Sequence, residues 1–142
     1  MKTYLDSSVL VSLYSLDANS APAARLLENL KGERLISSYG QLEVTNALHL
    51  RVFRKELPSS QVQHALKIFE QDLRDGVFRL RALPEGVFER SARIARQTTP
   101  RLGTRTADLL HVAAALELGA DYLYTFDDRQ KKLAEALRLK TN

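Results

Sequence analysis

The sequence contains no cysteine and no long hydrophobic run. The absence of cysteine excludes disulfide bonds, thiolate metal sites and cysteine nucleophiles, and it is compatible with a reducing compartment. The longest unbroken apolar run near the N-terminus is residues 9–11, which is too short for a signal peptide or a membrane span. We therefore expect a cytoplasmic protein that makes no contact with a membrane.

Internal repeats, low-complexity tracts and linkers are also missing, so we expect a single domain over residues 1–142. The hydrophobic fraction of 44% and the charged fraction of 27% are typical of a globular protein. The formal net charge is only +4, which favours contact with polyanions weakly. No glycine-rich phosphate loop occurs, and no G-x-S-x-G motif surrounds Ser7, which excludes two common catalytic patterns.

Short apolar runs alternate with longer segments of helical periodicity. The pattern predicts helices over residues 21–30, 39–55, 85–97, 107–118 and 127–137, with a further helix that starts at Pro58. It predicts strands at residues 2–8, 35–36, 78–83 and 122–125, with a fifth, very short strand at 139–140. This alternation indicates an α/β fold with a mainly parallel sheet of four to five strands.

Local signals place the helix ends and one loop. Ser38 and Gln41 have the spacing of a capping box for the helix that follows. The composition of residues 98–103 predicts a loop, after which Thr104 or Thr106 is expected to cap the next helix.

Four acidic residues are expected at one edge of this sheet. Asp6 and Asp127 end strands, while Glu43 and Asp108 are expected in the first turn of helices that begin at the same edge. Each acid alone could simply cap a helix or complement its dipole. Together, two carboxylates at roughly 5 Å repel by about 3 kcal/mol at an effective dielectric constant of 20, so the cluster must protonate, disperse or hold cations. Oxygen ligands without histidine or cysteine patterns favour Mg²⁺ or Mn²⁺.

Four segments carry these acids in order, and together they resemble the motifs of PIN-domain ribonucleases, most closely the VapC-type toxins of toxin–antitoxin pairs. The segments are residues 6–10 (DSSVL), 43–48 (EVTNAL), 108–119 (DLLHVAAALELG) and 123–128 (LYTFDD). The resemblance covers nearly the whole chain. It implies a three-layer α/β/α fold and a metal-dependent endoribonuclease that hydrolyses RNA phosphodiester bonds.

The resemblance also assigns roles to residues. It makes Asp6, Glu43, Asp108 and Asp127 the catalytic, metal-binding acids for one or two Mg²⁺ or Mn²⁺ ions, and it gives supporting places to Ser7, Thr125 and Asp128. Gln130 stands where the family often has an aromatic residue, and the terminal strand is short. We expect both departures to affect packing more than chemistry.

Candidate contacts and partners follow from the same resemblance. Arg101, Arg105 and Arg129 are the arginines nearest to the motifs and are candidate RNA contacts. A small antitoxin encoded beside the gene and a homodimer are the implied protein partners. His111 lies one helical turn after Asp108, and we interpret it as a packed histidine rather than a ligand or base.

Three other functions are compatible with parts of the pattern. A housekeeping RNA-processing nuclease of the same fold differs from a toxin by having no antitoxin gene beside it. A binding module that has lost catalysis is disfavoured, since all four acids are present. A phosphoaspartate protein is disfavoured because no second aspartate lies two residues after Asp6.

Overall fold

The computed structural model describes residues 1–142 and contains one five-stranded sheet. The strand order is β3-β2-β1-β4-β5, and every pairing is parallel. The strands are β1 (Lys2–Leu5), β2 (Glu33–Ser37), β3 (Arg79–Arg81), β4 (Tyr122–Tyr124) and β5 (Lys140–Thr141). The predicted α/β class and parallel sheet are confirmed, and the short terminal strand does join the sheet.

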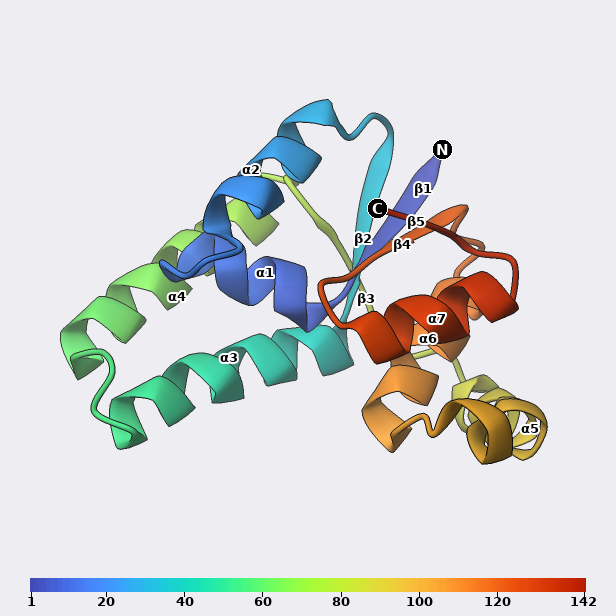
Figure 1. Ribbon diagram of the computed structural model, residues 1–142. Coiled ribbons are helices and arrows are strands. Elements are labelled where there is room, and N and C mark those ends of the chain that lie inside the picture. Colours follow the sequence, from blue (N-terminus) through green and yellow to red (C-terminus); the bar gives the residue numbers. More distant parts are fainter.

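Helices cover both faces of the sheet (Figure 1). One face carries α1 (Ser7–Tyr14), α2 (Ser20–Asn29), α3 (Ser38–Phe53) and α4 (Ser59–Arg74). The other carries α5 (Val87–Leu102), α6 (Thr106–Glu117) and α7 (Asp128–Ala136). None of the helices has the length and hydropathy that a membrane crossing requires.

Two separate hydrophobic cores explain the three layers. Successive side chains of a strand point to opposite faces of the sheet. Accordingly, Tyr4 and Leu35 pack into the core beneath α5, α6 and α7. Their neighbours Leu5 and Ile36 pack into the core beneath α1, α3 and α4. Both central strands are thus buried on two sides, which is the arrangement expected of a parallel sheet.

The strand order places a crevice beside the end of β1. From β1 the chain moves outward through β2 and β3, then returns to the other side of β1 to form β4 and β5. The connections therefore diverge between β1 and β4, and ligands bind at such a point at the carboxyl ends of the strands. Asp6 follows β1 directly, and Asp127 lies just beyond β4.

The loop predicted at residues 98–103 is wrong, because α5 continues through Pro100 to Leu102. Ile94 and Leu102 pack against the core of this face, and this packing overrides the weak helix propensity of the segment. The Thr98 hydroxyl donates to the Ile94 carbonyl at 2.8 Å. Gly103 ends the helix in the left-handed conformation, at φ 63°.

Two helix caps also differ from the predictions. Strand β2 runs straight into α3, so Ser37 rather than Ser38 is the N-cap, and its Oγ accepts from the Gly40 N–H at 3.0 Å. Glu43 consequently lies in the second turn of α3 instead of the first. Arg105 precedes α6 in place of a threonine cap, and its N–H donates to Asp108 Oδ2 at 2.9 Å.

Candidate active site

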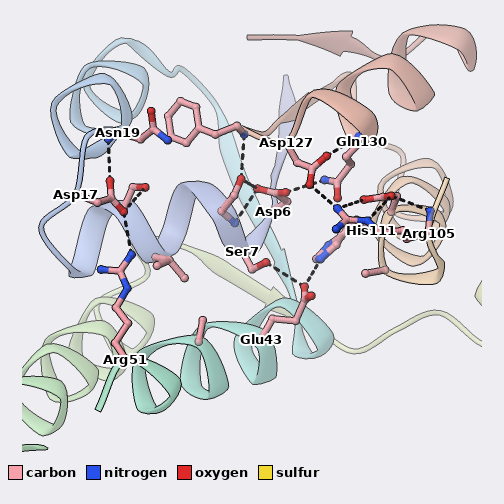
Figure 2. Close-up of a pocket in the computed structure, with 17 residues that line it drawn as sticks. Asp6, Ser7, Asp17, Asn19, Glu43, Arg51, Arg105, His111, Asp127 and Gln130 are labelled. Atoms are coloured by element: carbon pink, nitrogen blue, oxygen red, sulfur yellow. Dashed lines mark hydrogen bonds and ion pairs between the residues drawn. The ribbon is translucent and has the colours of Figure 1, made fainter. Parts of the chain in front are cut away.

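A pocket of about 420 Å³ opens where β1 and β4 end, and all four predicted acids line it. Figure 2 shows Asp6 and Asp127 approaching from the sheet edge, with Glu43 on α3 below them. Asp108 completes the set from the first turn of α6. Four segments that are distant in sequence therefore deliver carboxylates to one cavity.

Asp6 is buried and almost fully hydrogen-bonded. Its Oδ1 accepts from the Ser8 N–H at 3.0 Å and the Ser8 hydroxyl at 2.6 Å, and thus caps α1. Its Oδ2 accepts from Thr125 Oγ1 at 2.8 Å and Gln130 Nε2 at 2.9 Å. Burial raises the pKa of Asp6, and the hydrogen bonds from Ser8 and Thr125 offset only part of that effect. Asp6 is therefore both a helix cap and a member of the pocket.

Gln130 contributes to the site more directly than the sequence suggested. Its side chain is 2% exposed and donates to Asp6, in a position that lines the pocket. A phenylalanine ring at this place could not donate that hydrogen bond. The expectation that this departure affects mainly packing is corrected accordingly.

Arg105 holds Asp108 and Asp127 together. Its Nη2 lies 2.6 Å from Asp127 Oδ2 (Figure 2), and its Nε lies 3.4 Å from Asp108 Oδ2. The hydrogen bond to Asp108 and the charges of both acids raise the pKa of Arg105. Partial burial raises the pKa of Asp127, but the Gln130 N–H and Arg105 lower it by more, so the net pKa is below its usual value.

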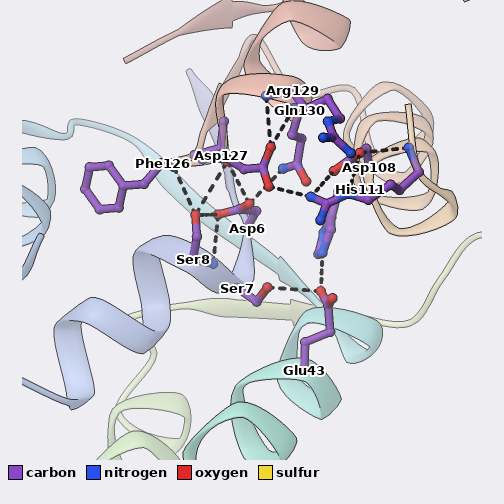
Figure 3. Close-up of polar contacts among 12 residues, drawn as sticks. Asp6, Ser7, Ser8, Glu43, Asp108, His111, Phe126, Asp127, Arg129 and Gln130 are labelled. Carbon is purple, nitrogen blue, oxygen red and sulfur yellow. Dashed lines mark hydrogen bonds and ion pairs between the residues drawn. The ribbon is translucent and has the colours of Figure 1, made fainter. Parts of the chain in front are cut away.

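Glu43 is held from two sides. Ser7 Oγ donates to Glu43 Oε1 at 3.1 Å, and His111 Nε2 contacts the same oxygen (Figure 3). A carboxylate can only accept, so we assign the ring proton to Nε2, and Nδ1 accepts from the Tyr4 hydroxyl at 2.8 Å. Burial raises the pKa of Tyr4, which keeps the phenol protonated for this role. His111 is packed as expected, and it also orients an acid of the pocket.

The remaining predicted residues lie at different distances from the acids. Asp128 and Arg129 line a second cavity of about 350 Å³, which shares Arg105 and Asp127 with the pocket. Arg101 lies in the last turn of α5 and lines neither cavity.

The pocket also contains residues that sequence reasoning missed: Asp17, Asn19, Arg51 and Phe126. A signal for Arg51 was present, because Glu43, Ala47 and Arg51 are spaced four residues apart on one face of a helix. No comparable pattern marks Asp17 or Asn19, which lie in the turn between α1 and α2.

The donor set suits a hard divalent cation. Five carboxylates and two guanidinium groups line the pocket, which leaves an excess of negative charge among mainly oxygen ligands. His111 also lines the pocket, but its two ring nitrogens are engaged by Glu43 and Tyr4. No three acidic or imidazole side chains already converge as a formed metal centre. Arg105 supplies the positive charge between Asp108 and Asp127, a place where two carboxylates need a neighbouring cation.

The three-layer fold with a polar pocket at the carboxyl edge of a parallel sheet defines an α/β domain of the kind that binds ligands at its topological switch point. The sequence matches the PIN domain family over residues 3–136, and the chain belongs to this family.

Solved structures support the fold at low sequence identity. The toxin VapC20 of Mycobacterium tuberculosis, described as cleaving the sarcin-ricin loop, has a TM-score of 0.72 and 18% identity over 92% of this chain and 93% of its own. FitAcB of Neisseria gonorrhoeae has a TM-score of 0.73 and 19% identity over 98% of this chain and 95% of its own. VapBC2 of Rickettsia felis, bound to a promoter DNA fragment, has a TM-score of 0.68 and 18% identity over 100% of this chain and 98% of its own. A search of curated proteins gave no significant match.

Proposed function

We propose that this chain is a metal-dependent endoribonuclease and the toxin of a VapBC-type toxin–antitoxin pair. The observation that carries the proposal is the meeting of Asp6, Glu43, Asp108 and Asp127 in one pocket of a PIN domain. The likeness to a toxin that cleaves the sarcin-ricin loop supports RNA as the substrate. The likeness to VapBC2 and FitAcB supports a small antitoxin partner. A homodimer and a cytoplasmic location belong to the same proposal.

The four acids would hold Mg²⁺ or Mn²⁺ in this pocket. When bound, such an ion lowers the pKa of a water molecule and stabilises negative charge on a leaving oxygen, as hydrolysis of a phosphodiester requires. The protein itself fixes the carboxylates: Thr125 and Gln130 direct Asp6, whereas Ser7 and His111 direct Glu43. This pre-organisation keeps the acids together despite their mutual repulsion.

Arg105 has two roles in the proposal. Without an added cation, its guanidinium neutralises Asp108 and Asp127. Its side chain is 56% exposed, so it can turn outward when a metal ion takes over that charge. In that position it is placed to bind an RNA phosphate next to the acids, since guanidinium groups recognise phosphate by two parallel hydrogen bonds.

The proposed reaction is direct attack of water, with no covalent intermediate on the protein. Ser7 Oγ donates to Glu43, and we assign that carboxylate to the metal ions rather than to activation of Ser7 as a nucleophile. We expect the products to carry a 5′-phosphate and a 3′-hydroxyl.

Incubation of the purified chain with total RNA, with Mg²⁺, with Mn²⁺ or with EDTA, tests the proposal. Wild-type protein is expected to cut RNA only with a divalent ion, and mapping the ends identifies the products. Asp127→Asn is the informative variant, because asparagine is an equally good N-cap for α7 and removes only the charge. Glu70→Gln on the exposed side of α4 is the matched control. Cleavage that persists in EDTA, or in Asp127→Asn at the wild-type rate, contradicts the proposal.

A second experiment separates a toxin from a housekeeping nuclease. Expression of the chain is expected to arrest growth, and co-expression of a small protein encoded by the adjacent reading frame is expected to restore it. Unimpaired growth at high expression of active enzyme would instead indicate a processing nuclease.

A further inference from the structure

The pocket extends beyond the acids along the walls formed by α1 and α3. On α3, Glu43, Ala47 and Arg51 form a row that lines the pocket, and the helical rise of 1.5 Å per residue separates the ends of this row by about 12 Å. Val11 lines the pocket from α1. The acids therefore occupy one end, and the opposite end is available for a different part of the substrate (Figure 2).

The far end presents fixed polar groups. Arg51 contacts the Ser15 hydroxyl, and its Nη2 lies 3.3 Å from Asp17 Oδ2. Ser12 Oγ donates to the same Asp17 oxygen at 3.0 Å. Because Asp17 neutralises Arg51, this end offers donors and acceptors with little net charge, which suits a base edge better than a phosphate.

Asn19 is an uncommitted hydrogen-bonding group at this end. It stands at the N-cap of α2, where asparagine usually bonds the first turn, yet its side chain makes no capping hydrogen bond. The side chain is exposed and lines the pocket, so its amide is available as both donor and acceptor.

Phe126 supplies an aromatic face beside the acids. Its N–H donates to Ser8 Oγ at 2.9 Å, which fixes its backbone at the sheet edge. Its ring points away from the acids (Figure 3) and belongs to neither hydrophobic core, although it lines the pocket. An aromatic ring that packing does not require, next to a polar edge, is the combination with which proteins hold an unstacked base.

We propose that Phe126, Asn19 and the Asp17–Arg51 pair form a nucleobase subsite for a nucleotide that flanks the bond to be cut. The base stacks on Phe126 above the apolar floor of Val11 and Ala47, and its edge bonds Asn19 and the Asp17–Arg51 pair. This inference rests on the proposed ribonuclease function, and it adds that a base next to the cut must leave its stack to enter this subsite.

The test pairs a protein change with an RNA change. A short single-stranded RNA that contains a mapped cut site is labelled, and its binding to the chain carrying Glu43→Gln, which prevents cleavage, is measured by fluorescence anisotropy. Phe126→Ala is expected to weaken binding about ten-fold, in line with the loss of one stacked base. Removing the base on one side of the cut is expected to weaken binding of the parent protein by a similar factor.

The two changes should not add when combined, because each removes the same contact. Asn19→Ala, made without the Glu43→Gln change, should alter the base preference at that position. Mapping the cut sites in RNA measures this preference. Phe88→Ala, which removes an exposed ring on α5 outside the pocket, is the matched control.

The outcomes separate the two proposals. If wild-type protein cleaves RNA but Phe126→Ala and Asn19→Ala bind and cut like the controls, the subsite is absent and the nuclease assignment stands. If the effects of Phe126→Ala and base removal add fully at both flanking positions, the base does not stack on this ring. If wild-type protein neither binds nor cleaves RNA, the nuclease proposal falls and the subsite falls with it.

Discussion

At the scale of single residues, the environment of Asp6 shows how a buried carboxylate is maintained. Its two oxygens accept hydrogen bonds from groups that arrive from the start of α1 and from the segment after β4. A buried charge without such partners would cost several kcal/mol. The role of Gln130 could not be predicted from the sequence, because it depends on the position of Asp6, which lies 124 residues away along the chain.

Gln130→Leu tests that contact. The substitution keeps the volume of a buried side chain and removes the donor to Asp6, so we expect the free energy of unfolding to fall by about 2 kcal/mol, as for hydrogen bonds to charged groups. Urea unfolding of metal-free protein measures the change. Gln61→Leu, at an exposed position of α4, is expected to alter stability by less than about 0.5 kcal/mol. Equal effects of both substitutions would show that the hydrogen bond has no special value.

Arg105→Gln tests the displacement of an internal cation. Removing the guanidinium leaves Asp108 and Asp127 without their counter-charge, so we expect Mn²⁺ to bind several-fold more tightly in isothermal titration calorimetry. Stability should change by less than about 1 kcal/mol because the ion pairs are partly exposed. Arg101→Gln removes the same charge at the end of α5 and serves as the control. Weaker Mn²⁺ binding by Arg105→Gln would mean that the arginine helps to hold the metal.

At the scale of elements, three of the four predicted acids of the pocket lie at the N-termini of helices. Asp6 caps α1, Asp127 caps α7, and Asp108 bonds the backbone at the start of α6. These positions could be predicted because strand and helix boundaries are marked by local sequence. The exact start of α3 could not be predicted, because β2 leads into this helix without a loop. The continuation of α5 could not be predicted either, because it depends on packing against α6.

The junction between α5 and α6 sets where Arg105 and Asp108 lie, and Gly103 makes its turn possible. At φ 63° a side chain is strained, although no atom lies within 4 Å of an added Cβ. Gly103→Ala is therefore expected to cost about 1–2 kcal/mol from backbone strain alone. Gly86→Ala, before α5 and outside the left-handed region, should cost less. Thermal unfolding compares the two, and equal losses would contradict the assignment of strain.

At the scale of the whole molecule, the alternation of strands and helices predicted the parallel sheet, and the sheet brought the acids to one edge. The sequence could not predict the second half of the pocket. Asp17 and Asn19 reach it only because α1 and the turn after it fold across α3, a tertiary arrangement without a local signature.

Metal binding should stabilise the whole domain. A ligand that binds only the folded state at 100 times its Kd adds about 2.7 kcal/mol to the free energy of unfolding. We expect saturating Mn²⁺ to raise the Tm of wild-type protein by several degrees, and that of Asp127→Asn by less. Metal-free Asp127→Asn should unfold near the wild-type temperature, since its cap is retained. An identical Mn²⁺ response of both proteins would exclude Asp127 from the metal site.

The most direct measurement is anomalous diffraction from a crystal soaked in Mn²⁺. The proposed site predicts a peak among Asp6, Glu43, Asp108 and Asp127, with the Arg105 guanidinium turned away from Asp108 and Asp127. A pocket without a peak, in which Arg105 still bridges the two aspartates at full Mn²⁺ concentration, would contradict the metal-dependent nuclease.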